Sequence, residues 1–280
     1  MLEINDGKTY INVFDNITEA HEYLTKSKRR KKASRSSEEP DFVWSGCSLN
    51  DAYELFKYGD EDTYKRLLET QQELKIKDLY NCCVRNKKQF FNDRVGYQPN
   101  VPNYLKGIPT SMINSNNNKL NYKIINIYVN MSVNRFVRSD DILKNGTIFA
   151  FIIDFLEKQG YRCNLYVGDS TNLYSETEIH CLVRIKTDRE PLNLKKMAYG
   201  IANVSFERSL MFRWTEVANY TDGETWYGYG ASYNETSKIK KTLEKYLKSK
   251  FIVLNHQKEF SCDIKEIKKT LEEQGIILGD

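Results

Sequence analysis

The sequence predicts an α/β protein with a doubly wound, mostly parallel sheet, preceded by a smaller, mainly helical N-terminal region. Strand-like and helix-like segments alternate from residue 121 onward, and this alternation is typical of parallel strands joined by right-handed helical crossovers. Hydrophobic residues make up 40% of the 280 positions, which suits a globular chain with a large core. We therefore divide the chain into an N-terminal region, 1–120, and an α/β domain, 121–280.

Helix signals dominate the N-terminal region. Residues 10–24 predict a strand or turn that leads into a short helix. The next helix should begin at a cap supplied by Ser48 or Asn50 and end at Gly59, because hydroxyl or amide side chains favour helix starts and glycine favours helix ends. A further helix is expected over 61–80.

Two segments of the N-terminal region lack such patterns. Residues 25–37 are basic and serine-rich, which predicts a flexible loop. Residues 85–120 are rich in proline, glycine and asparagine, which predicts an irregular connector. A connector of this length is either functional or a domain boundary.

The second half is built around one apolar helix at 139–159. Ser139, Asp140 and Asp141 should cap its start, and Gly160 should end it. Its middle is apolar almost all round, which predicts deep burial. The strand at 178–186 follows another strand without a helix between them, which predicts an antiparallel edge strand. The other expected elements are strands at 123–130, 162–168 and 251–254 and helices at 192–202, 206–216, 236–249 and 263–274.

One basic segment decides the charge balance. The net charge is +4, and seven lysines and arginines lie between residues 26 and 35 with no acid among them; without these seven charges it falls to −3. The rest of the chain therefore does not form a basic surface for nucleic acid overall, and this loop would make any phosphate contacts. A solvated loop is the other interpretation. The cations expected to contact phosphate are Lys28, Arg29, Arg30, Lys31 and Lys32.

Several classes of site are absent from the sequence. The six cysteines form no CxxC pair and show no zinc-ligand spacing. Neither G-x-G-x-x-G nor G-x-x-x-x-G-K-[ST] occurs, which argues against nucleotide phosphate loops. No signal peptide opens the chain and no apolar run is long enough to span a bilayer, so we expect a cytoplasmic protein without a membrane partner.

Two groups of side chains suit partner binding. Trp226, Tyr227 and Tyr229 lie in a glycine-rich loop, and exposed aromatic residues favour protein contacts or base stacking. Arg208 and Arg213 would form an anion- or partner-binding patch, or else an ordinary helix surface.

His180 lies on a predicted strand and would act as a base or as a structural histidine. No serine or cysteine nucleophile has a recognisable motif beside it.

The loop after strand 123–130 is the default ligand site of an open α/β sheet. It carries Asn130, Ser132 and Asn134, spaced two apart. A strand, an Asx-x-Ser-x-polar loop, a long apolar helix and a second strand resemble a von Willebrand factor A domain, in which an Asp-x-Ser-x-Ser loop holds a divalent metal. The resemblance implies Mg²⁺ at these three residues. Asn130 replaces the aspartate and supplies no carboxylate, so the other interpretation is a degenerate loop whose amides cap turns.

A second resemblance spans residues 42–275. The sequence around Trp44-Ser45-Gly46, the Val101-Pro102 segment and the Arg208 to Glu216 helix are similar to an uncharacterised family of bacteriophage and prophage proteins. This resemblance implies a viral or mobile-element origin and a bacterial host cell, with no activity attached.

These observations predict a phage-encoded, non-enzymatic protein that binds a host or phage macromolecule, for example in anti-defence or assembly, and whose partner is a protein. Two alternatives stay open. One is a nucleic-acid-associated protein that uses residues 26–35. The other is a metal-dependent hydrolase that uses Asp140, Asp141 or Asp169 near the strand ends. We expect no cofactor, with Mg²⁺ as the one alternative, and the sequence leaves the oligomeric state open.

Overall fold

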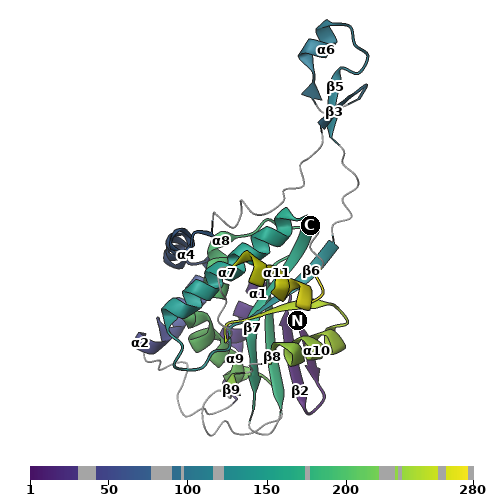
Figure 1. Cartoon of the computed structure of the whole chain (residues 1–280). Coiled ribbons are helices and arrows are strands. Elements are labelled where there is room, and N and C mark those ends of the chain that lie inside the picture. The colour runs from purple at the N-terminus through teal and green to yellow at the C-terminus, as the bar shows by residue number, and fades with distance from the viewer. Residues whose placement is uncertain are drawn as a thin grey trace.

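The structure is a computed structural model of the chain (Figure 1) and describes nine segments of it. These are residues 1–30, 42–76, 90–95, 98–115, 123–173, 177–220, 231–232, 235–257 and 263–276.

A seven-stranded mixed sheet organises the chain. Its order is β1-β2-β8-β7-β6-β10, with β9 paired to β7 beside this path. Three of the five neighbouring pairs along the path are parallel, namely β2–β8, β6–β7 and β6–β10. The expected α/β class with a mostly parallel sheet is therefore confirmed. The strands are β1 (Leu2–Asn5), β2 (Thr9–Phe14), β6 (Lys123–Asn130), β7 (Tyr161–Asn172), β8 (Glu178–Lys186), β9 (Ala231–Ser232) and β10 (Phe251–Asn255).

The strand β8 is antiparallel to β7, as predicted, but it is not an edge strand. Its other side pairs with β2, which runs parallel to it from Thr9 opposite Glu178 to Phe14 opposite Val183. All six residues of β2 are buried. The edge assignment was wrong because the partner strand comes from the N-terminal region that the sequence pattern marked as mainly helical.

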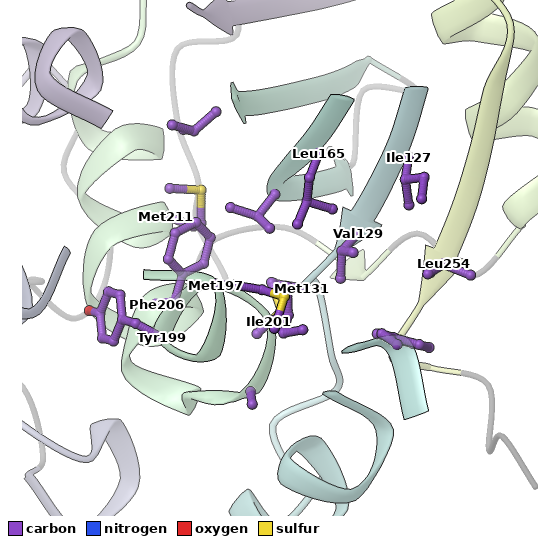
Figure 2. Packing of buried hydrophobic residues seen from close by; sticks show 14 of the residues in the cluster. Ile127, Val129, Met131, Leu165, Met197, Tyr199, Ile201, Phe206, Met211 and Leu254 are labelled. Atoms are coloured by element: carbon purple, nitrogen blue, oxygen red, sulfur yellow. The ribbon is translucent and has the colours of Figure 1, made fainter. Parts of the chain in front are cut away.

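Helices cover both faces of the sheet. The alternation along β10 shows the two layers, since Ile252 and Leu254 belong to a large cluster while Phe251 and Val253 belong to a smaller one under α10. In Figure 2, side chains of the sheet and of α8 pack together within the large cluster. The helices of the main body are α1 (Ile17–Lys26), α2 (Phe42–Ser45), α3 (Leu49–Tyr58), α4 (Glu61–Glu73), α7 (Ser139–Lys158), α8 (Leu194–Ala202), the π-helix η1 (Phe206–Met211), α9 (Phe212–Val217), α10 (Thr236–Leu247) and α11 (Ile264–Glu273).

The helix ends mostly follow their sequence signals. Ser48 caps α3 through a capping box with Asp51, and Gly59 ends that helix at a φ of 92°. The start of α7 differs from the prediction, because the cap position is Arg138 and no side chain caps it. Arg138 instead pairs with Asp141 at 3.2 Å, so the carboxylate that was expected to cap the helix neutralises an arginine.

The two sides of the expected boundary at residue 120 share one core. The Tyr199 hydroxyl of α8 donates to the Ala52 carbonyl of α3 at 3.2 Å. The Asn203 amide donates to Asp60, the cap of α4, at 2.8 Å. The division into domains stays a prediction, but the main sheet and its core contain elements from both sides of it.

Residues 90–115, which we call the small lobe, hold regular structure where an irregular connector was expected. β3 (Phe90–Asp93), β5 (Met112–Ser115) and β4 (Gln98–Pro99) form a three-stranded antiparallel sheet in that order, with the short helix α6 (Val101–Leu105) between β4 and β5. Figure 1 shows this lobe apart from the main sheet.

Candidate functional site

The amide of Asn130 fixes the loop that leaves β6. Asn130 is fully buried, and its Oδ1 accepts hydrogen bonds from the backbone N–H groups of Ser132 at 3.2 Å and of Ser170 at 2.9 Å. One side-chain oxygen therefore satisfies two buried donors and ties the loop to β7. This geometry agrees with the interpretation in which the amide holds a turn.

The three residues expected to hold Mg²⁺ do not share one environment. Ser132 is buried like Asn130, whereas Asn134 is exposed. The Asn134 Oδ1 accepts from the Phe136 N–H at 3.3 Å, an Asx turn at the surface. In the described part of the chain, no three histidine, cysteine, aspartate or glutamate side chains gather in a metal-binding group.

A buried carboxyl group lies beside this loop, on β7. Asp169 is 3% exposed, and its Oδ2 accepts from the Thr171 hydroxyl at 2.7 Å. Burial raises the pKa of Asp169, while hydrogen bonds from Thr171 and Ser132 act in the opposite direction. The other oxygen, Oδ1, is buried and has no hydrogen-bond partner among the described residues.

A second buried carboxyl group reaches the same loop from η1. Glu207 is 4% exposed, and its Oε1 accepts from the Val133 N–H at 2.8 Å. Burial raises the pKa of Glu207 well above its usual range, and the charge of Asp169 raises it further. Within the described part of the chain, its Oε2 also lacks a hydrogen-bond partner. We call Asp169 and Glu207 the carboxyl pair. In the loop, Ser132 contacts Asp169 and Val133 contacts Glu207.

Glu207 belongs to a buried π-helical turn. The sequence predicts an ordinary helix at 206–216, but residues 206–211 form the π-helix η1, and only then does α9 begin. All six residues of η1 are buried, including the adjacent charged residues Glu207 and Arg208. π-Helical turns are rare in proteins as a whole, and those that do occur are often found at functional sites.

Arg208 and Arg213, expected as a partner-binding patch, are held inside the fold. Arg208 is 6% exposed, donates to the carbonyls of Trp44 at 2.7 Å and Val137 at 2.8 Å, and lies over the Trp44 ring at 4.4 Å. Arg213 is 8% exposed and donates to the carbonyl of Ser27 at 3.0 Å. Both guanidinium groups satisfy backbone carbonyls, so a structural role accounts for them.

His180 belongs to a buried network across β6, β7 and β8. Its Nδ1 lies 2.9 Å from the Ser170 hydroxyl, which also lies 2.9 Å from the Tyr128 hydroxyl. His180 is fully buried, and Glu178 Oε2 lies 3.6 Å from its Nε2. These contacts favour the structural role for this histidine.

The remaining site predictions fall on separate parts of the chain. Arg29 pairs with buried Glu216 at 3.5 Å, and Arg30 donates to the Asn219 side chain at 2.6 Å, so both arginines contact the end of α9. Lys28 is exposed. Lys31, Lys32, Trp226, Tyr227 and Tyr229 lie outside the described residues.

The three carboxylates of the hydrolase alternative are not brought together. Asp140 and Asp141 lie in the first turn of α7, where exposed Asp140 pairs with Arg66 and half-buried Asp141 pairs with Arg138. Asp169 is buried within the sheet.

The comparisons with known proteins give a family without a described function. A family model described as a domain of unknown function, DUF7192, matches residues 3–277. The chain belongs to the DUF7192 family. No curated protein and no solved structure matches it. Across the described segments, none of the helices has the length and apolar composition to cross a membrane.

Sequence reasoning missed two features of this DUF7192 chain. Glu207 was overlooked because a charged residue on a predicted helix usually faces solvent, whereas all six residues of η1 are buried. The small lobe carries the other feature, a set of apolar side chains that no core covers. The sequence did contain a signal for it, since apolar residues recur between the prolines of 95–109 without a strand or helix period. The exposed members are Val95, Val101, Tyr104, Leu105 and Ile108.

Asn130→Ala should destabilise the fold by about 2 kcal/mol, because two buried N–H groups lose their acceptor. Asn134→Ala is the matched control, since it removes one surface Asx turn and should change stability by less than about 0.5 kcal/mol. Urea unfolding of both variants measures the difference. Equal losses for the two variants would refute the role given to Asn130.

Proposed function

We propose that this chain is a non-enzymatic protein-binding module whose small lobe docks onto a partner protein. The partner would be a host or phage protein, in keeping with the resemblance to bacteriophage and prophage sequences. One observation carries the proposal: the lobe has regular backbone structure but no buried side chain among residues 92–95 and 98–113.

The exposed apolar side chains of the lobe are large. Val95 is 75% exposed, Tyr104 is 71% exposed and Leu105 is 78% exposed. Ordering a residue costs about 1–2 kcal/mol of backbone entropy, which burial normally offsets. A segment this short rarely builds a core of its own. A partner surface that covers these side chains would supply the missing burial.

The charge of the lobe favours a protein partner over a nucleic acid. Among residues 90–115 the charged side chains are Asp93, Arg94 and Lys106. Phosphate backbones are bound by clusters of lysine and arginine, which this lobe lacks. Few charges around exposed aromatic and aliphatic anchors are typical of the centres of protein interfaces.

We further propose that the main sheet is a degenerate von Willebrand A-like or Rossmann-like sheet that serves as a scaffold. The succession of β6, a polar loop, α7 and β7 supports this assignment. The exposed position of Asn134 and the two N–H groups held by Asn130 favour a loop that has a structural role in place of a metal site.

A paired substitution in the lobe tests the docking function. Tyr104→Ser with Leu105→Ser should weaken partner binding at least about 30-fold, because interface anchors commonly contribute 2 kcal/mol or more. The matched control is Tyr58→Ser with Phe136→Ser, which removes two exposed aromatic rings from the main body. The thermal midpoint should stay within about 1 °C in both pairs, since no buried contact is lost.

The partner is first identified with a photo-crosslinking amino acid at position 104, and its affinity is then measured by interferometry. Equal partner affinities of the lobe double variant and the control double variant would overturn the proposal. So would crosslinks confined to a second copy of the chain, or binding to lipid vesicles in place of a protein.

A further inference from the structure

A row of lysines covers the outer face of α10. Lys238, Lys241, Lys245 and Lys248 are spaced three, four and three residues apart, and this spacing places side chains on one side of an α-helix. All four are exposed. We call these four residues the basic face. It spans eleven residues, 238–248, which is about 15 Å along the helix axis.

The opposite side of α10 is buried and apolar. Ile239 and Leu243 pack in the smaller core cluster with Phe251 and Val253 of β10. The basic face therefore has a fixed direction, away from the sheet. Its charges do not depend on a flexible loop for their position.

The acidic groups near α10 leave most of this face positive. Glu244 is turned toward the fold, where its Oε1 accepts from the Phe251 N–H at 3.0 Å. Glu235 pairs with Lys238 at 2.6 Å at the start of the helix. The Lys245 ammonium group donates to the Tyr246 hydroxyl at 3.1 Å. It also interacts electrostatically with Asp6, which follows β1. Glu178 accepts from the Thr242 hydroxyl of α10 at 3.1 Å. Among the described residues, Lys241 and Lys248 are left as exposed cations.

Positive charge is concentrated in this segment. Residues 236–250 contain six lysines and one glutamate. This segment alone has a larger net charge than the whole chain, whose net charge is +4. Such asymmetry creates a local positive potential that attracts polyanions.

Lys248 adopts a conformation that favours glycine. It ends α10 with a φ of 53° and a ψ of 32°, the left-handed region, where a side chain is disfavoured and glycine is the common helix-terminating residue. A lysine at this position extends the basic face by one more charge at a conformational cost. Strained backbone positions of this kind cluster at functional sites.

We propose that the basic face of α10 binds the phosphate backbone of a nucleic acid without reading its sequence. Lysine is depleted in the centres of protein interfaces, which argues against an ordinary protein partner. Membrane-surface helices combine a basic face with exposed apolar residues, whereas the apolar residues of α10 pack on the sheet. A nucleic-acid backbone needs only the repeated cations, which contact phosphates one by one. This inference is independent of the docking function of the small lobe.

Binding of the full chain to a fluorescent 20-nucleotide single strand tests the inference. With three phosphate contacts the affinity should fall about 20-fold between 50 and 200 mM salt. The triple variant K241Q/K245Q/K248Q should weaken binding at 50 mM salt at least about tenfold and flatten the salt dependence. The matched control is K57Q/K65Q/K195Q, which removes three exposed lysines from α3, α4 and α8 and should leave binding within about twofold.

Lys248→Gly separates binding from folding. This variant should raise the thermal midpoint, because glycine adopts the left-handed region without strain, and it should weaken binding because one cation is lost. A merely structural role for Lys248 would not give these opposite effects. No binding at 50 mM salt, equal losses in the two triple variants, or binding to anionic vesicles but not to the single strand would each overturn the inference.

Discussion

Gly168→Ala should destabilise the protein by about 4 kcal/mol or more, one of the largest effects of any single substitution in this fold. A Cβ atom at Gly168 would lie 1.8 Å from the carbonyl oxygen of Cys181 on β8 and 2.7 Å from its carbonyl carbon. Both atoms belong to backbone in the middle of the sheet, so the two strands must separate locally. Because domains of ordinary stability unfold at 5–15 kcal/mol, the variant should be largely unfolded or insoluble at 37 °C.

The same glycine also supports the loop after β6. Gly168 pairs with Asn130 across β6 and β7, and its carbonyl accepts from the Met131 N–H at 2.8 Å. A shift of β7 at this point would move the Ser170 N–H away from Asn130 as well. The damage therefore reaches the carboxyl pair and is not confined to one strand contact.

Gly200→Ala is the matched control, because Gly200 also faces β7. A Cβ atom there would meet a methyl group of Val167 at 3.2 Å, and a side chain can give way by a few tenths of an ångström. Replacing glycine by alanine inside a helix gains up to about 1 kcal/mol, which offsets that contact. Soluble yield and urea unfolding should differ sharply between the two variants. A Gly168→Ala protein as stable as Gly200→Ala would refute the close packing of β7 against β8.

The elements that could be predicted from the sequence are those with local signals. The start and end of α3 follow from Ser48 and Gly59, and the strand at 178–186 has the expected limits, because caps and apolar runs are recorded in neighbouring residues. The buried helix α7 follows from an apolar run that leaves no polar face in its middle. Such features need no knowledge of distant parts of the chain.

The pairing of β2 with β8 could not be predicted in this way. These strands lie about 170 residues apart, and a short apolar strand shows no preference for one partner in its own sequence. The same limit applies to the carboxyl pair, since Asp169 lies on β7 and Glu207 on η1, and folding alone brings both to the loop after β6. The candidate site was located correctly at the end of β6, but its buried ionisable groups come from β7 and η1.

The location of charge shows a related limit. The densest basic run in the sequence lies in residues 26–35, yet Arg29 and Arg30 contact Glu216 and Asn219 in the structure. The basic face of α10 is less conspicuous in the sequence because apolar residues separate its lysines. Only the helix period and the burial of Ile239 and Leu243 show that these cations form one surface.

Alkaline pH should destabilise the folded protein through Glu207. Burial and the neighbouring Asp169 raise the pKa of Glu207 well above its unfolded value near 4.5. Below pH 4.5 the group is protonated in both states and has no effect. Above that value the unfolded chain releases the proton while the folded protein retains it, so the free energy of unfolding decreases by up to about 1.4 kcal/mol per pH unit until the folded carboxyl group ionises.

Glu207→Gln should remove this pH dependence. The glutamine carbonyl still accepts from the Val133 N–H but cannot ionise, so the variant should be more stable than the parent at pH 8 and similar to it at pH 4.5. Glu69→Gln, an exposed change of the same chemistry on α4, is the control and should leave the slope of the parent unchanged. Urea unfolding at half-unit steps from pH 4.5 to pH 8.5 measures all three proteins.

Asp169→Asn distinguishes a coupled pair from two independent acids. Asp169 contributes to the raised pKa of Glu207 through its charge, so its removal should narrow the pH range over which Glu207 destabilises the fold. In a double-mutant cycle, the two substitutions should then be non-additive at pH 8 and closer to additive at pH 4.5, because a lower pH favours the uncharged form of both groups. Additive effects at both pH values would show that the two carboxyl groups titrate separately. Equal pH dependence of stability in the parent and in Glu207→Gln between pH 5 and pH 8 would contradict the buried position of Glu207 itself.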